Sequence, residues 1–226
     1  MKKLVGWFLI LCSPILLVSM GKKSGITTRS IPIVKFKNKP ATTLQETRWN
    51  KAEVAKHKRH SVERIVAKIE RSKSRYELVS AKTGVPWHII ASFHNMEASL
   101  NFSKHLHNGN PLTKRTYWVP KGRPVGGKPP FTWEFSAEDA LKYDKMGRID
   151  WKVLDSSLYA CERYNGTGYL RYHKNVPTPY LWSYTSIYKR GKYVSDGKWS
   201  NTAVSKQCGI VPIWKLLEER GHIKFK

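Results

Sequence analysis

The sequence predicts a mainly α-helical domain over residues 61–226, with long loops that are rich in aromatic side chains. Apolar residues recur at helical spacing after Ser61, and a Gly-Val-Pro sequence at residue 84 opens a second apolar helix. The chain of 226 residues is long enough for one sizeable core, and nine Trp and eleven Tyr supply many flat aromatic faces. We therefore expect one folded domain, preceded by two segments of a different kind.

The first segment, residues 1–20, is predicted to be a signal peptide or a membrane anchor. Lys2 and Lys3 precede the apolar stretch 4–20, and polar residues return at Gly21. Seventeen residues lie at the lower limit for crossing the hydrocarbon layer, and no clear cleavage site follows, so both alternatives stay open. In either case we expect export, to the periplasm or the cell exterior, with attachment to the inner membrane if the segment is retained.

The second segment, residues 21–60, is predicted to be a basic, flexible tether. It has eleven Lys or Arg against only Glu46 and Glu53, and it has few large apolar residues. Because such a composition does not build a core, we expect an extended chain that becomes helical only near residues 49–59.

The domain then begins with a helix at Ser61, which Gly84 ends. Pro86 suits the first turn of the next helix, where its missing N–H costs little, and that helix leads through apolar residues to Glu97. The apolar positions of the first helix are Val62, Ile65, Val66, Ile69, Tyr76, Leu78 and Val79.

Glu97 is the candidate catalytic residue. A carboxyl group at the end of a buried helix loses water, which raises its pKa toward the range where it can protonate a leaving oxygen. Hydroxyl, amide and imidazole side chains follow it in the sequence. This pattern favours an enzyme that cleaves glycosidic bonds.

The net charge of +25, from 41 basic and 16 acidic side chains, indicates an anionic partner. Nucleic acid would fit this charge, but export argues against it. An envelope polymer such as peptidoglycan, with its peptide stems and attached anionic polymers, fits both observations. A basic surface without a dedicated partner is the remaining alternative. Residues 179–197 interleave Tyr and Trp with Lys and Arg, a composition that suits either sugar rings or nucleic-acid bases.

The cysteine and histidine residues say less about the function of the protein. Cys161 and Cys208 can form one disulfide or remain as two buried thiols, and neither lies in a CxxC pair that would favour a redox or zinc role. His105 and His107 alternate as metal ligands can, but no third ligand follows at a convincing spacing. Contacts to sugar groups, or to the backbone of their own loop, suit these imidazoles better.

Two motifs resemble the lysozyme superfamily, especially the lytic transglycosylase and goose-type lysozyme branches and lysozyme-like proteins of phages and bacteria. The first is the Gly-Val-Pro helix that leads to Glu97 and Phe102; the second is YACERYNGTGY at residues 159–169. Many relatives have Ser directly after the Glu, where this chain has Ala98, so Ser99 would supply that hydroxyl. The Gly-Leu-Met-Gln turn of ordinary lytic transglycosylases is missing, and the loop 105–110 would replace it.

The resemblance spans roughly residues 73–221 and implies cleavage of peptidoglycan strands, as a muramidase, a lytic transglycosylase or an endolysin. Glu97 would act as general acid and then as base, with no metal or organic cofactor, in a monomer. The alternative is a non-catalytic protein that binds envelope glycan. The residues expected to contact the sugar are Ser99, Asn101, His107, Tyr164, Asn165, Tyr180 and Trp182.

A second catalytic carboxylate, which most glycosidases use, is not evident in the sequence. Glu134, Glu138 and Asp139 lie near SAEDAL, which is predicted to be a helix N-terminus, where acidic residues favour the helix dipole. We therefore expect these three to be structural. Glu162 lies near the second motif and is expected to face away or to pair with Arg163 or another cation.

Overall fold

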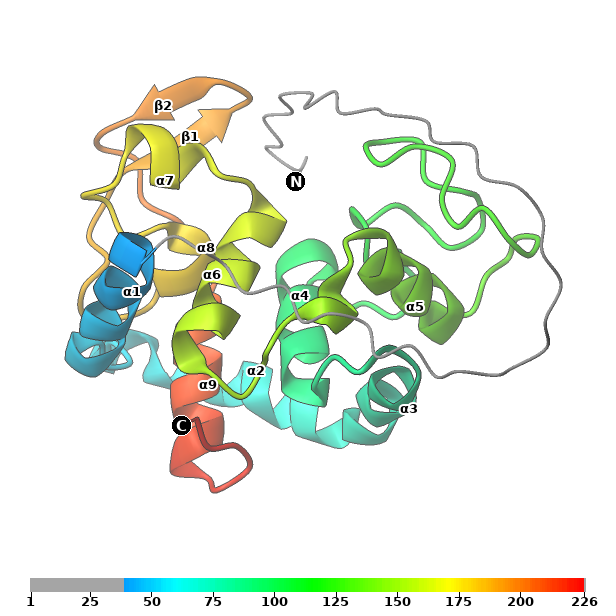
Figure 1. Ribbon diagram of the computed structural model, residues 1–226, viewed down its shortest axis with the longest axis horizontal. Coiled ribbons are helices and arrows are strands. Elements are labelled where there is room, and N and C mark those ends of the chain that lie inside the picture. Colours follow the sequence, from blue (N-terminus) through cyan, green and yellow to red (C-terminus); the bar gives the residue numbers. More distant parts are fainter. Residues whose placement is uncertain (1–38, 226) are drawn as a thin grey trace, which may run out of the picture.

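A single buried helix, α4 (Trp87–Ala98), lies at the centre of the computed structural model, which describes residues 39–225 (Figure 1). Ile89, Ile90 and Phe93 on this helix are fully buried, as expected for a helix that is apolar on several faces. Pro86 directly precedes the helix and Glu97 lies in its last turn. The sequence therefore placed this helix correctly.

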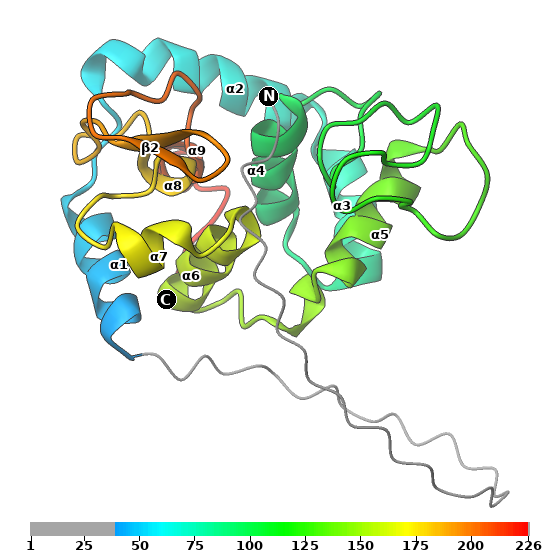
Figure 2. The same ribbon diagram turned by 90° about the horizontal axis from the view of Figure 1, so that it is seen from above.

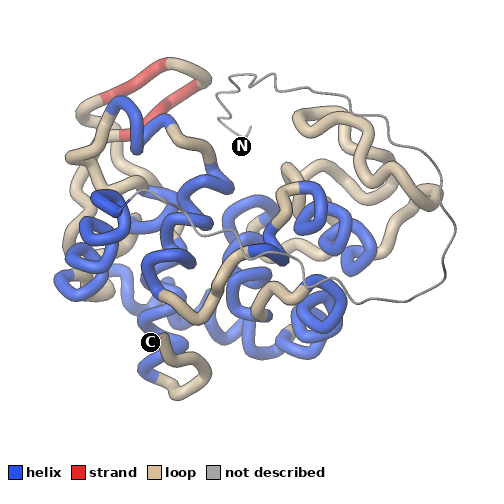
Figure 3. Tube along the Cα trace, viewed as in Figure 1, coloured by secondary structure: helices blue, strands red, loops and turns tan. Residues whose placement is uncertain are grey.

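Other helices surround α4, so the predicted mainly α-helical class is confirmed for the described residues. Figure 3 shows one small strand pair and several long loops between the helices. The remaining α-helices are α1 (Lys39–Lys51), α2 (Arg59–Arg71), α3 (Lys73–Thr83), α5 (Trp133–Tyr143), α6 (Leu154–Asn165), α7 (Gly168–Tyr172), α8 (Pro179–Trp182) and α9 (Ile210–Glu219), and the strands are β1 (Lys192–Ser195) and β2 (Lys198–Ser200).

The helices pack around α4 in two groups. Helices α3 and α9 contact α4 directly, while α5 packs on α3 and α2 packs on α9. On the other side α6 packs against α1 and α8, as Figures 1 and 2 both show. Helix α4 is tied to α9 by Ser92, whose Oγ accepts a hydrogen bond from Trp214 Nε1 at 2.9 Å. The candidate carboxylate is thus carried by a helix most of whose residues are buried.

Several helix boundaries differ from the prediction. The helix expected from Ser61 begins at Arg59 and is interrupted at Ser72, which leaves the helical region and divides it into α2 and α3. Gly84 ends α3 in the left-handed conformation, with φ 71°, as predicted. Helix α5 begins at Trp133, before SAEDAL, because Thr132 Oγ1 accepts a hydrogen bond from Phe135 N and caps it there.

The packed domain also begins earlier than residue 61. Trp49 is 6% exposed and Ala52 is 3% exposed, and the Trp49 ring packs against Trp214 and Phe225. Trp49 on α1 and Ala52 directly after it therefore fix a segment whose composition predicted a tether, and the helix expected near residues 49–59 lies mostly earlier, at Lys39–Lys51. The predicted signal or anchor and the first part of the tether lie outside the described residues. Within residues 39–225, no helix is both long and apolar enough to cross a membrane.

The long loop between α4 and α5 is held by buried polar side chains. The two ring nitrogens of His105 contact Ser136 Oγ at 2.7 Å and Lys114 O at 2.8 Å. Asn108 Nδ2 donates to Trp118 O at 3.0 Å, and Asp139 on α5 binds Arg123. His105 therefore holds its own loop in place, which is one of the roles expected for the histidines.

The β1–β2 hairpin was not predicted. Tyr193 on β1 faces Trp199 on β2, and Gly197 in the connecting turn has φ 66°. The Trp199 ring stacks on His173, with ring centroids 3.5 Å apart. Aromatic packing therefore fixes the hairpin next to α7.

Candidate functional site

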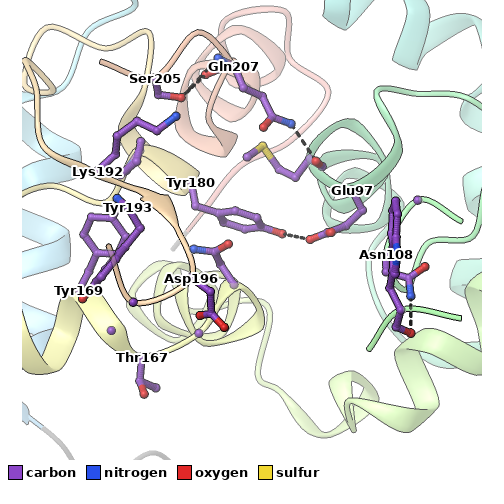
Figure 4. A pocket seen from close by; sticks show the side chains of 18 of the residues that line it. Glu97, Asn108, Thr167, Tyr169, Tyr180, Lys192, Tyr193, Asp196, Ser205 and Gln207 are labelled. Atoms are coloured by element: carbon purple, nitrogen blue, oxygen red, sulfur yellow. Dashed lines mark hydrogen bonds between the residues drawn. The ribbon is translucent and has the colours of Figure 1, made fainter. Parts of the chain in front are cut away.

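A cavity of about 500 Å³ opens between the end of α4 and the β1–β2 hairpin (Figure 4). The loop after α4 forms one side, while α6, α7 and the hairpin form the other. The side chains that line it are a mixture of polar and aromatic groups, which suits a ligand with hydroxyl groups and flat ring faces. The lining includes Glu97, Ser99, Lys104, Asn108, Trp118, Asn165, Arg171, Tyr172, Tyr180, Lys192, Tyr193, Asp196 and Gln207.

Glu97 is half-buried at the floor of this cavity, where Tyr180 O–H donates a hydrogen bond to its Oε1 at 3.1 Å. Burial, more than the nearby negative charge of Glu97, raises the pKa of Tyr180 well above its usual value. The phenol therefore stays protonated and remains a donor. Figure 4 shows the two side chains pointing toward each other. One carboxylate oxygen of Glu97 is thereby held in place.

The backbone beneath Glu97 is fixed from a distant part of the chain. Gln207 Nε2 donates to Met96 O at 2.8 Å, which satisfies a carbonyl at the end of the helix. Ser99 and Leu100 then both have positive φ, 53° and 59°, so the chain turns sharply directly after α4. Positive φ is costly for residues other than glycine and persists only where the surroundings impose it. The structure therefore specifies the direction of the Glu97 side chain.

Gly109 lies directly against Glu97. A Cβ atom at Gly109 would be 2.6 Å from Glu97 O, and the residue has φ 75°. Only glycine suits both the close approach and this backbone conformation. Sequence reasoning missed this contact, because its only signal is one glycine in HLHNGNPL.

Four of the predicted site residues line the cavity: Glu97, Ser99, Asn165 and Tyr180. Asn165 is the last residue of α6, and Gly166 follows with φ 117°, so the predicted helix and turn bring Asn165 to the cavity. The two motifs, about 70 residues apart in the sequence, therefore meet at one site.

The other four predicted contacts do not line the cavity. Trp182 is fully buried in the core, and Asn101 Oδ1 accepts a hydrogen bond from Ser103 N. His107 Nε2 bonds Asp139 Oδ2 at 2.8 Å, so this imidazole serves the loop. Tyr164 stacks on Phe93, with ring centroids 4.1 Å apart.

The acidic residues expected to be structural all form ion pairs. Glu134 pairs with Arg75 at 2.6 Å, Glu138 with Lys142 at 2.6 Å, and Asp139 with Arg123 at 2.5 Å. None of the three lines the cavity.

Glu162 also lies away from the cavity, buried between α6 and α1. Gln45 Nε2 donates to its Oε2. Burial raises the pKa of Glu162 to about 7, although the nearby charge of Arg48 opposes this shift. Glu162 thus faces away from the cavity, one of the two alternatives expected, and the positive charge that acts on it, Arg48, lies on α1.

Cys161 and Cys208 are both buried free thiols, so of the two alternatives the disulfide is not formed. Within residues 39–225, no three His, Cys, Asp or Glu side chains gather closely enough to hold a metal ion.

Sequence reasoning missed most of the charged and aromatic residues that complete the cavity, although Lys192 and Tyr193 belong to the aromatic and basic segment 179–197 that it singled out. Lys104, Arg171 and Lys192 line it, and none of these three cations forms an ion pair within the part of the chain that the structure describes. Trp118 and Tyr172 line it too, with 39% and 68% of their surface exposed. The lining therefore offers unpaired positive charge and open aromatic faces to a ligand.

Comparisons of the chain with protein-family models, curated proteins and solved structures found no match.

Proposed function

We propose that this chain is an exported, monomeric, lysozyme-like enzyme that cleaves the glycan strands of peptidoglycan, with Glu97 as the proton donor and acceptor. The observation that carries the proposal is the position of Glu97. It is half-buried at the end of the central helix, it faces a cavity of about 500 Å³, and a tyrosine hydroxyl holds one of its oxygens. Such a carboxyl group suits general acid–base catalysis.

In the proposed reaction Glu97 first protonates the glycosidic oxygen, and the bond from that oxygen to the anomeric carbon breaks. Glu97 then accepts a proton from the attacking hydroxyl, which belongs to water or to the sugar itself. Asn165 and Ser99 lie in the same cavity and can bond sugar hydroxyl or N-acetyl groups. The chain's own residues therefore supply all the proton transfers.

The charge and shape of the cavity support an anionic glycan as substrate. Trp118 and Tyr172 offer exposed ring faces for sugars, from opposite sides of the cavity. Lys104, Arg171 and Lys192 can pair with the carboxylates of peptide stems. An uncharged glycan would leave these three cations without partners.

The test is release of soluble fragments from purified peptidoglycan by the full-length protein and by Glu97→Gln. The full chain is needed because Trp49 on α1 and Ala52 directly after it are part of the core. We expect cleavage to fall by at least about 10²-fold in the variant. The matched control is Glu77→Gln, which neutralises a carboxylate that pairs with Lys73 on the surface of α3 and should leave cleavage unchanged.

The second candidate is a non-catalytic protein that binds envelope glycan, favoured by the unpaired cations of the cavity. If neither the wild type nor Glu97→Gln releases fragments but both sediment with the peptidoglycan, this binding function replaces the enzyme.

A further inference from the structure

The tip of the β1–β2 hairpin brings a second carboxylate to the cavity of Glu97. Among the residues that line this cavity, Glu97 and Asp196 are the only two with carboxyl groups. Figure 4 shows Asp196 on the hairpin side and Glu97 on the helix side. The two acids are about 100 residues apart in the sequence, and only the fold relates them.

The turn itself does not use the Asp196 side chain. Aspartate in a tight turn commonly bonds a nearby backbone N–H, as Asp150 Oδ1 does here with Lys152 N at 3.2 Å. Asp196 makes no hydrogen bond or ion pair with any residue between 39 and 225, and it is exposed. Gly197, with φ 66°, supplies the unusual backbone conformation of the turn. The Asp196 carboxylate is therefore available to the cavity.

The hairpin that carries Asp196 is anchored. Its Trp199 stacks on His173, and Tyr193 packs so closely on α7 that a Cβ at Gly168 would lie 3.3 Å from its ring. Tyr169 contacts both of these hairpin rings, with centroids 5.5 Å away. A group on this hairpin can thus be positioned against a substrate.

We propose that Asp196, in place of Glu97, accepts the proton of the attacking water as general base, which makes the protein an inverting hydrolase rather than a transglycosylase. This inference rests on the proposed function. Inverting glycosidases place acid and base on opposite faces of the sugar ring, with room for one water. Glu97 gives its proton to the leaving oxygen as the glycosidic bond breaks. The oxygen of water bonds to the anomeric carbon from the other face, and the water proton passes to Asp196. Both carboxyl groups return to their starting states by exchange with solvent.

The experiment compares full-length wild type, Asp196→Asn, Asp196→Ala, Glu97→Gln and the control Asp150→Asn on purified peptidoglycan strands. Mass spectrometry separates reducing ends from anhydro ends, NMR identifies the first-formed anomer, and thermal unfolding checks the fold of each variant. For the wild type we expect reducing ends whose anomeric configuration is inverted. Asp196→Asn should lower the rate about 10²- to 10⁴-fold, while Asp150→Asn should not. Added formate or azide should partly restore turnover in Asp196→Ala, since a small anion can replace a missing base but cannot repair a turn.

Three results would overturn the role of Asp196 and leave cleavage by Glu97 standing: anhydro products, retained configuration, or a normal rate in folded Asp196→Asn, each with an inactive Glu97→Gln. A different result, no cleavage by the wild type, would overturn the proposed function and this inference with it.

Discussion

Helices α4 and α6, two of the helices that bring residues to the cavity, are supported in opposite ways. Helix α4, which carries Glu97, is held by apolar packing and neutral hydrogen bonds, such as that of 3.0 Å between Tyr76 Oη and His94 Nδ1. Helix α6, which carries Asn165, faces α1 through the ionisable groups of Glu162 and Arg48. Burial lowers the pKa of His94 to about 4 and raises that of Glu162 to about 7. The α4 side of the site should therefore lose stability in acid, and the α6 side should lose stability as the pH rises.

The largest effect should come from Glu162. The unfolded chain releases this proton near pH 4.5 and the folded chain near pH 7, so the folded state loses stability as the pH rises between these values. The loss is about 3 kcal/mol at 1.36 kcal/mol per pKa unit. Glu162→Gln should remove this loss of stability. The unfolding free energies of the variant and the wild type are measured at pH 5 and at pH 8, and the difference between the two proteins should change by about this amount between the two pH values. The control Glu77→Gln should show the same dependence of unfolding free energy on pH as the wild type. The same dependence in Glu162→Gln would refute the raised pKa of Glu162.

His94 gives the converse expectation for α4. The unfolded chain binds a proton near pH 6.5, but the folded imidazole does so only near pH 4, so stability falls as the pH drops through this window. Loss of stability in acid should therefore persist in Glu162→Gln. Its absence would show that α4 does not depend on a neutral His94.

Two glycine variants separate the effect of backbone strain from the effect of moving Glu97. Gly109→Ala must move Glu97 O, which lies 2.6 Å from the new Cβ, and should lower cleavage about 10²-fold by misplacing the acid. Gly84→Ala is the matched control, since its φ of 71° is nearly the same but no atom lies within 4 Å of the new Cβ. Both variants should lose about 1 to 2 kcal/mol of stability from the left-handed conformation. Equal cleavage rates in the two would mean that the close approach does not position Glu97.

Removing the Tyr180 hydroxyl tests how far Glu97 depends on the hydrogen bond from this residue. Tyr180→Phe keeps the buried ring and loses the 3.1 Å hydrogen bond, so we expect kcat to fall about tenfold, with little change in KM. Tyr184→Phe removes another tyrosine hydroxyl, which donates to Lys206 O at 2.7 Å; neither residue lines the cavity, so kcat should be unchanged. A normal kcat in Tyr180→Phe would show that this hydrogen bond does not position Glu97.

The smallest effect is expected on the hairpin side. Lys192→Gln should raise KM for peptidoglycan by roughly threefold to tenfold at low salt, and the difference should shrink at high salt, because exposed charges are screened. Lys189→Gln changes a nearby exposed cation that does not line the cavity and serves as the control. Equal effects of both changes would indicate general charge attraction rather than a contact in the cavity.

The sequence predicted the α4 side of the site because its signals are local. Apolar spacing, Pro86 and Gly84 together place Glu97 at the end of a buried helix. The other side depends on contacts between distant residues, such as Gln207 with Met96 and the aromatic packing of the hairpin on α7. Composition also failed for residues 39–60, where Trp49 and Ala52 are buried in the core although the segment is basic. Neither periodicity nor composition reports such pairings.

The two buried thiols have a consequence for where the protein can fold. Burial raises the pKa of Cys208 to about 12, and that of Cys161 also rises, so neither thiol readily forms the reactive thiolate. Residues 39–225 therefore reach their packed state through side-chain contacts alone, without a covalent cross-link between helices. The same domain should fold with equal stability on the reducing and the oxidising side of a membrane, independently of any disulfide-forming machinery.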